Sequence, residues 1–246
     1  MQYSQSGTRT RLWSRWAITG ALLLSGIGAS AGAEKAPGRF SDPLGSIHEQ
    51  PLTQYRAYRR MHARSEHFGQ EGWLEAWTEM DERGFRFNIV SETGSEYIRN
   101  KVLKAILRRE QDLMAGGECR RSELTPDNYE FEEARQGDGE QYVIMKPKRK
   151  DVLLVDGRVV LSQDGRELLR VEGRLATNPS CWPSLVNVIR HYARVDGVRV
   201  PVSTESTAKV KLAGLSYLDV RYEYETINGR QVSLEARRAL PPAPLR

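Results

Sequence analysis

The side chains best suited to acid–base chemistry or metal binding are four histidines, and their spacing favours neither task. His62 and His67 lie five residues apart, which does not place them on one face of a helix. His48 and His191 have no second histidine close by in the sequence. A metal site needs three or four converging ligands. We therefore interpret all four histidines as surface or half-buried side chains and predict no metal site.

Signatures of enzyme chemistry are missing from the sequence. It contains no GxSxG, phosphate-binding loop, HExxH or dinucleotide fingerprint. Glu130 and Glu132 are clustered, but their spacing puts both on the wet face of one strand, where nothing marks either as a general acid. The sequence thus predicts a protein that is not an enzyme and that needs no cofactor.

Two cysteines, Cys119 and Cys181, leave two interpretations open. In an oxidising compartment they could form a disulfide. They could also be two unrelated, partly buried thiols, because nothing in the sequence fixes the distance between them. No CxxC repeat accompanies them, so they do not indicate a metal site.

The first 33 residues have the layout of a secretory signal peptide. Three arginines precede an apolar run from Trp16 to Ile27, and small residues follow it. The apolar run is shorter than the ~20 residues that a spanning helix needs. We expect cleavage after Ala31 or Ala33 and a periplasmic protein without a transmembrane span; the alternative is an uncleaved membrane anchor.

The net charge of +5 belongs partly to this leader. Removing residues 1–33 takes away three arginines and no acid, so 34 basic residues remain against 32 acidic ones, a formal charge of +2. A nearly neutral chain without a basic run interleaved with aromatics does not indicate a nucleic-acid partner.

The clearest structural pattern is a long alternation from Val198 to Tyr224. Valines and other apolar or small residues occupy every second position up to Leu212. Arg199, Glu205 and Lys209 occupy positions between them. The pattern resumes after Gly214. Successive side chains of a strand point to opposite faces, so two long strands with one apolar and one wet face are expected. The dry face must be covered by something.

The rest of the chain predicts an antiparallel meander with two helices near its start. Asp–Gly and Asn–Gly pairs, including Asp156-Gly157 and Asp196-Gly197, separate alternating runs as hairpin turns do. Residues 51–64 and 95–114 carry apolar residues at helical spacing. The predicted fold class is mainly β (α+β): a curved antiparallel sheet, or incomplete β-barrel, of about ten strands covered by about two helices. Residues 34–50 are expected to be a linker, 51–236 one domain and 237–246 a flexible tail.

Apolar residues that face the space between sheet and helices form the candidate ligand pocket. They are the following residues: Trp77, Phe85, Phe87, Ile98, Val102, Ile106, Val200, Val202, Val210, Leu218, Val220 and Tyr222. The same residues would also serve as ordinary core packing.

This layout resembles the LolA/LolB-like superfamily of periplasmic lipoprotein-localisation factors. The local likeness is strongest over residues 192–201, an aspartate–glycine hairpin followed by a valine–proline strand start. Residues 94–103 resemble segments of uncharacterised exported bacterial proteins. The resemblance implies an incomplete barrel whose apolar hollow, covered by helices, binds acyl chains of lipoproteins or other amphiphiles. No functional residue of that superfamily can be carried over.

Two functions therefore stay open. One is a periplasmic carrier that buries lipid or lipoprotein acyl chains between sheet and helices. The alternative is a module that contacts envelope proteins, through a strand edge or the arginine face of residues 56–64, with a packed interior and no carried ligand.

Overall fold

The computed structural model describes residues 50–116, 121–137, 139–178, 183–210, 214–233 and 236. The predicted signal peptide, most of the linker, both cysteines and the tail lie outside these ranges. The described part of the chain contains no helix long and apolar enough to cross a membrane.

Within these ranges the chain forms twelve strands and one helical run. The strands are β1 (Tyr55–Ser65), β2 (Gln70–Asp81), β3 (Gly84–Gly94), β4 (Tyr129–Phe131), β5 (Arg135–Gly137), β6 (Glu140–Pro147), β7 (Val155–Ser162), β8 (Leu168–Leu175), β9 (Pro183–Val195), β10 (Val198–Val210), β11 (Gly214–Ile227) and β12 (Arg230–Gln231). The helical run consists of α1 (Glu96–Ile98), the π-helical turn η1 (Arg99–Leu103) and α2 (Lys104–Ala115).

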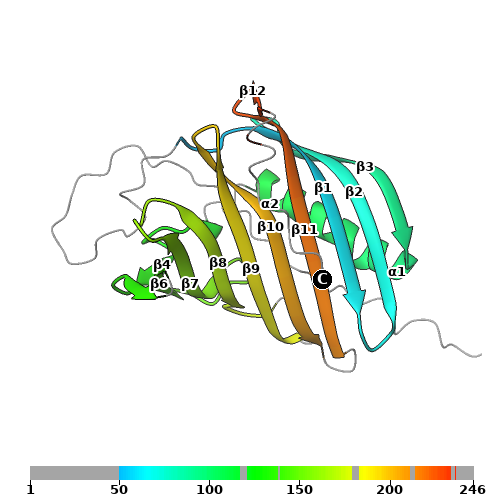
Figure 1. Ribbon diagram of the computed structural model, residues 1–246. Coiled ribbons are helices and arrows are strands. Elements are labelled where there is room, and N and C mark those ends of the chain that lie inside the picture. The colour runs from blue at the N-terminus through cyan, green and yellow to red at the C-terminus, as the bar shows by residue number, and fades with distance from the viewer. Residues whose placement is uncertain are drawn as a thin grey trace, which may run out of the picture.

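The strands form a single antiparallel sheet in the order β3-β2-β1-β11-β10-β9-β8-β7-β6-β4, with β12 beside β11 and β5 beside β6. The sheet is open, because β3 and β4 lie at its two edges. In Figure 1 the long strands twist across the molecule and the helical run lies along one face of the sheet. The predicted fold class is confirmed, with twelve strands in place of about ten.

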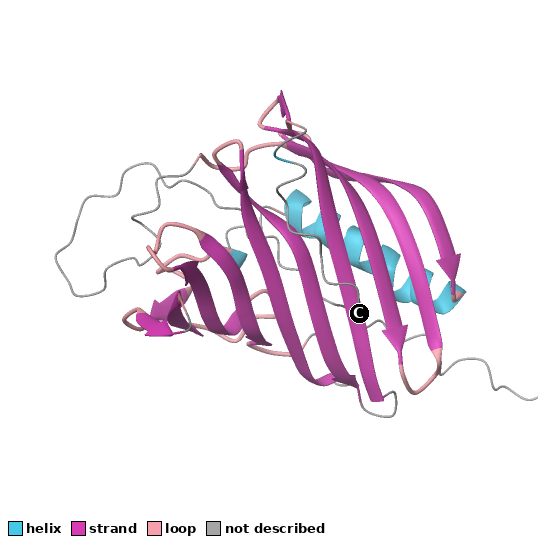
Figure 2. Cartoon of the chain, viewed as in Figure 1, coloured by secondary structure: helices cyan, strands magenta, loops and turns pink. Residues whose placement is uncertain are grey.

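The helix follows local signals that the sequence carries. Ser95 is the N-cap, and its side chain accepts a hydrogen bond from the Ile98 amide at 3.5 Å. Gly116 is the C-cap, as the paired glycines indicated. Figure 2 shows this helix covering the part of the sheet built from β11, β1, β2 and β3.

Two hydrophobic clusters lie on the sheet. The first joins the helix to β1, β2, β10 and β11 and contains Leu74, Leu103 and Val220. The second lies over β6 to β9 and contains Val143, Val159 and the helix residue Leu113. The helix therefore packs mainly on the first cluster and contributes Leu113, near its C-terminal end, to the second.

The predicted helix over residues 51–64 is wrong, because this segment is strand β1. Its buried residues recur with period two, from Tyr55 through Ala57, Arg59 and Met61 to Ala63. Arg59 interrupts the apolar pattern in the sequence although its side chain is buried. This segment pairs with β11 on one side and with β2 on the other, and that tertiary pairing overrides its weak helical spacing.

Two further details differ from expectation. Asp156-Gly157 does not turn the chain but lies inside β7, where a Cβ on Gly157 would meet the Glu172 carbonyl oxygen of β8 at 2.1 Å. Arg199, expected on the wet face, is buried. By contrast, Asp196-Gly197 forms the predicted hairpin turn, with φ of 50° and 83°.

Candidate functional site

A small apolar hollow lies between the helical run and the sheet, and we call it the notch. Its volume is about 50 Å³. The helix contributes Ile98, Val102 and Ile106, which lie on one helical face. The sheet contributes the remaining lining residues: Ala63, Arg64, Ser65, Val186, Ser206, Ala208, Ser216, Tyr217 and Leu218. One water-sized group needs about 10–15 Å³, so a few such groups fit without any movement.

The notch exists because small side chains face the helix at this end of the sheet. Ser65, Ser216 and Ala208 are neighbours across β1, β11 and β10, and the next row holds Ala63 and Ser206 on either side of Leu218. Alanine and serine side chains are too small to fill the space opposite this face of the helix. The hydroxyl oxygen of Ser216 is buried and has no hydrogen-bond partner within the described residues. A buried polar atom left unpaired needs an explanation, and a ligand that supplies a partner is one.

The other end of the helix is tightly packed around a buried ion pair. Arg59 of β1 and Glu110 of α2 form two hydrogen bonds, Nη1 to Oε2 at 2.5 Å and Nη2 to Oε1 at 2.6 Å. Arg59 Nη2 also donates to the Tyr55 hydroxyl at 2.7 Å, and its guanidinium lies over the rings of Phe85 and Tyr222. Both charged side chains are almost fully buried. Glu110 therefore fixes α2 to β1, the third strand from the β3 edge of the sheet.

Burial dominates the electrostatics of this packed end. It raises the pKa of the Tyr55 hydroxyl, although the Arg59 charge opposes the shift. Burial of the cation acts to lower the pKa of Arg59, but the combined effects of Glu110, Tyr55 and Tyr222 are larger, so this pKa is raised. Both shifts move away from physiological pH, so Tyr55 stays neutral and Arg59 stays charged there.

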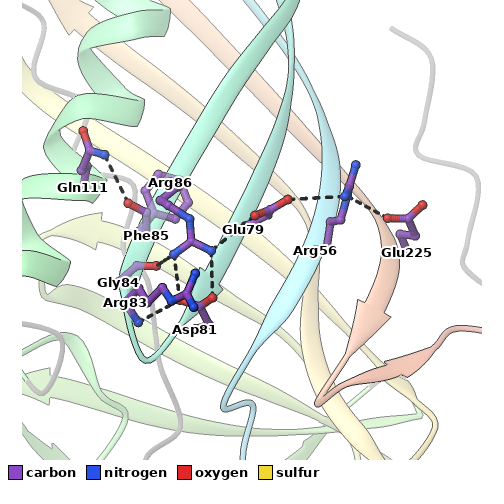
Figure 3. Close-up of polar contacts among 9 residues, drawn as sticks. All are labelled: Arg56, Glu79, Asp81, Arg83, Gly84, Phe85, Arg86, Gln111 and Glu225. Carbon is purple, nitrogen blue, oxygen red and sulfur yellow. Dashed lines mark hydrogen bonds and ion pairs between the residues drawn. The ribbon is translucent and has the colours of Figure 1, made fainter.

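A second polar connection ties α2 to the edge strand β3 (Figure 3). Gln111 donates from Nε2 to the Phe85 carbonyl oxygen at 3.2 Å. Nearby, Asp81 accepts from Arg86 at 2.7 Å and from the Arg83 amide at 2.8 Å, which fixes the β2–β3 turn. The Arg86 guanidinium lowers the pKa of Asp81 to about 2. The C-terminal half of the helix is thus held twice.

The half over the notch has its own connections. The Ser95 amide donates to the Glu71 carbonyl oxygen at 2.8 Å. Glu92 pairs with Arg99 at 2.9 Å and with Lys104 at 2.7 Å.

The pocket residues predicted from the sequence divide into three groups. Four line the notch: Ile98, Val102, Ile106 and Leu218. Six belong to the same hydrophobic cluster or pack against it without lining the notch: Phe85, Phe87, Val200, Val202, Val220 and Tyr222. The other two lie elsewhere: Val210 in the second cluster, and Trp77 on the opposite face of the sheet, against Tyr58 and Arg56.

Sequence reasoning missed the small residues of the notch. A search for large apolar side chains passes over Ala63, Ser65, Ser206, Ala208 and Ser216. One signal in the sequence could have found them: Ser206 and Ala208 continue the alternate, inward-facing positions of β10 that valines occupy before them. A small side chain at an inward-facing position of a strand fills less space than the valines beside it, so such positions are where a hollow can form.

The opposite face of the sheet carries a wider, open hollow of about 670 Å³ around Trp73 and His62. The two rings are stacked with centroids 4.6 Å apart. Arg60 pairs with Glu75 at 3.4 Å, and Arg221 pairs with Asp219 at 3.0 Å. The charges of this hollow are therefore balanced by one another.

The arginine face predicted as a partner contact lies on this same side. Arg56 pairs with Glu225 at 2.8 Å, Arg60 also pairs with Glu223, and Arg64 lies over the Tyr217 ring. No group of three or more potential metal-ligating side chains comes together among the described residues.

Similarity to known proteins is found only at the level of solved structures. No family model and no curated protein matches the chain. Among solved structures, a LolA superfamily protein from Nitrosomonas europaea is similar at 11% identity and a TM-score of 0.35, over 79% of this chain and 93% of that one. A DUF1329 family protein from Desulfovibrio piger is similar at 12% identity and a TM-score of 0.34, over 70% and 84%. The first of these proteins belongs by name to the superfamily that the sequence layout resembles. Since both TM-scores lie below 0.5, we derive the function from the notch alone.

Proposed function

We propose that this protein is an exported carrier that binds the acyl chain of a lipid or lipoprotein in the notch. The observation that supports this proposal is the unfilled apolar space between Ile98, Val102 and Ile106 on the helix and the small side chains of β1, β10 and β11. Each methylene buried there contributes about 0.8 kcal/mol. A chain of several methylenes needs more room than 50 Å³.

The distribution of contacts indicates how that room is made. Glu110 holds the C-terminal half of the helix through a fully buried ion pair. The N-terminal segment is held by the partly exposed Arg99–Glu92 pair at 2.9 Å. The π-helical turn η1 (Arg99–Leu103) lies between the helix start and α2, and such turns weaken the regular hydrogen-bond ladder. We expect the segment from Glu96 to Leu103 to move away from the sheet when a chain enters, which breaks the Arg99–Glu92 pair, while α2 stays in place.

A fluorescent fatty-acid probe tests the proposal. Ser206→Leu adds three carbon atoms to the notch and should weaken probe binding by about tenfold or more, because bulk replaces the space that the chain uses. The matched control is Thr207→Leu, the next residue on β10, which has the opposite strand parity and does not line the notch. Equal losses in both variants, or no binding by the unmodified protein, would contradict the proposal. The second result would favour a protein-interaction module.

A further inference from the structure

The inner face of the sheet carries a second buried arginine, Arg190 of β9, and its surroundings differ from those of Arg59. Its exposed fraction is only 5%. Its Nε donates to the hydroxyl oxygen of Thr204 at 3.2 Å. Within the described residues this is its one hydrogen-bond partner, and no carboxylate there pairs with it. Arg59, by contrast, has a full bidentate partner in Glu110.

Apolar side chains surround the Arg190 position. Val188 and Tyr192 precede and follow it on the same face of β9, and Val171 is its neighbour on β8. The Tyr129 hydroxyl is close enough for the Arg190 charge to act on it: burial raises the pKa of Tyr129 to about 12, and Arg190 is among the cations that oppose this rise. Burying a cation without a counter-charge is unfavourable, so natural proteins rarely keep one without a use.

The register places Arg190 next to the notch. Val186 lines the notch and lies four residues before Arg190 on the same face of β9. Across the ladder, Thr204 faces Arg190, and Ser206, two residues further along β10, lines the notch. Two residues of a strand span about 7 Å. A chain lying in the notch therefore ends within reach of the Arg190 side chain.

We propose that Arg190 binds the oxyanion headgroup of the ligand whose acyl chain occupies the notch, so that the preferred ligand is an anionic amphiphile such as a fatty acid. This inference rests on the proposed function. Nε is engaged by Thr204, and the Nη groups supply the planar donors that a carboxylate or phosphate accepts. The headgroup then serves as the missing counter-charge, and Thr204 orients the guanidinium.

The experiment compares dodecanoate with dodecanol by calorimetric titration of the full chain, because the two ligands share a chain and differ in headgroup charge. We expect dodecanoate to bind about tenfold more tightly, because its carboxylate accepts charge-assisted hydrogen bonds from Arg190 that a neutral hydroxyl cannot match. Arg190→Met should abolish this preference and leave dodecanol affinity within about twofold. Arg174→Gln is the matched control, because it removes an exposed arginine from the adjacent strand β8 and should change neither affinity.

The outcomes separate the two proposals. If dodecanol and dodecanoate bind equally well to the unmodified protein, the acyl-chain carrier stands and the role of Arg190 is wrong. If neither binds, both proposals fail. If acetate binds as tightly as dodecanoate, Arg190 forms a small-anion site and the amphiphile assignment is wrong. Stability supplies an independent readout: without ligand, Arg190→Met should unfold at the same denaturant concentration as the unmodified protein or at a higher one. A clear loss of stability would show that Arg190 has a structural role and would overturn the inference.

Discussion

Replacing Glu110 by glutamine should destabilise this protein more than any other single charge removal on the helix. The change keeps the shape of the side chain but leaves the Arg59 guanidinium buried without a counter-charge. The two hydrogen bonds at 2.5 and 2.6 Å lose their ionic character, and both side chains are at most 2% exposed. Solvent therefore cannot compensate the loss.

The expected magnitude follows from this burial. Removing one partner of a buried ion pair costs about 3–5 kcal/mol of unfolding free energy. For a domain of about 200 residues, each kcal/mol corresponds to roughly 2–4 °C, so the Tm of Glu110→Gln should fall by roughly 6–20 °C. The matched control is Asp112→Asn, an exposed charge removal two residues further along the same helix, which should stay within about 0.5 kcal/mol.

Urea unfolding followed by circular dichroism measures both variants. The double variant Arg59→Met/Glu110→Leu should recover most of the lost stability, because replacing both partners with apolar side chains leaves no buried charge. A loss below about 1 kcal/mol for Glu110→Gln would refute the reasoning, since the pair would then behave like an exposed one. The same result would remove the basis for a fixed C-terminal half of the helix.

Two further outcomes test the sheet. Gly157→Ala should destabilise the protein by more than about 2 kcal/mol in urea unfolding, because its Cβ would lie 2.1 Å from the Glu172 carbonyl oxygen. The control Gly137→Ala should be tolerated, because its Cβ meets nothing closer than 3.5 Å. Equal losses of stability in the two variants would contradict the close approach of β7 and β8. The pKa of Asp81 is lowered to about 2 from an ordinary value of 3.8, so its stabilising effect is present above pH 4 and is lost as the pH falls towards 2. Asp81→Asn should therefore reduce stability at pH 7 and make no difference near pH 2, as unfolding measured at both pH values would show; a stability difference that does not change with pH would contradict the assignment.

The sequence by itself determined the parts of the fold that local chemistry controls. Alternation over β10 and β11 predicted two long strands with one dry face, and the helix over 95–114 was predicted from its N-cap, its apolar face and its terminal glycines. Hairpin turns such as Asp196-Gly197 need positive φ, which their residue types indicate. Each of these signals acts over a few residues, so each can be recognised without knowing the rest of the chain.

Only the tertiary structure decided which face each strand turns to the helix and where packing stops. The segment over β1 looked helical because Leu52, Tyr55 and Tyr58 approximate helical spacing. Its strand buries Arg59, and that burial depends on Glu110, 51 residues away. Trp77 was expected in the pocket but lies on the opposite face, since the register of β2 turns Leu74 and Ala76 inward. The notch arises where small side chains of three strands come into register beneath one helix, a coincidence of long-range pairing that no local pattern encodes.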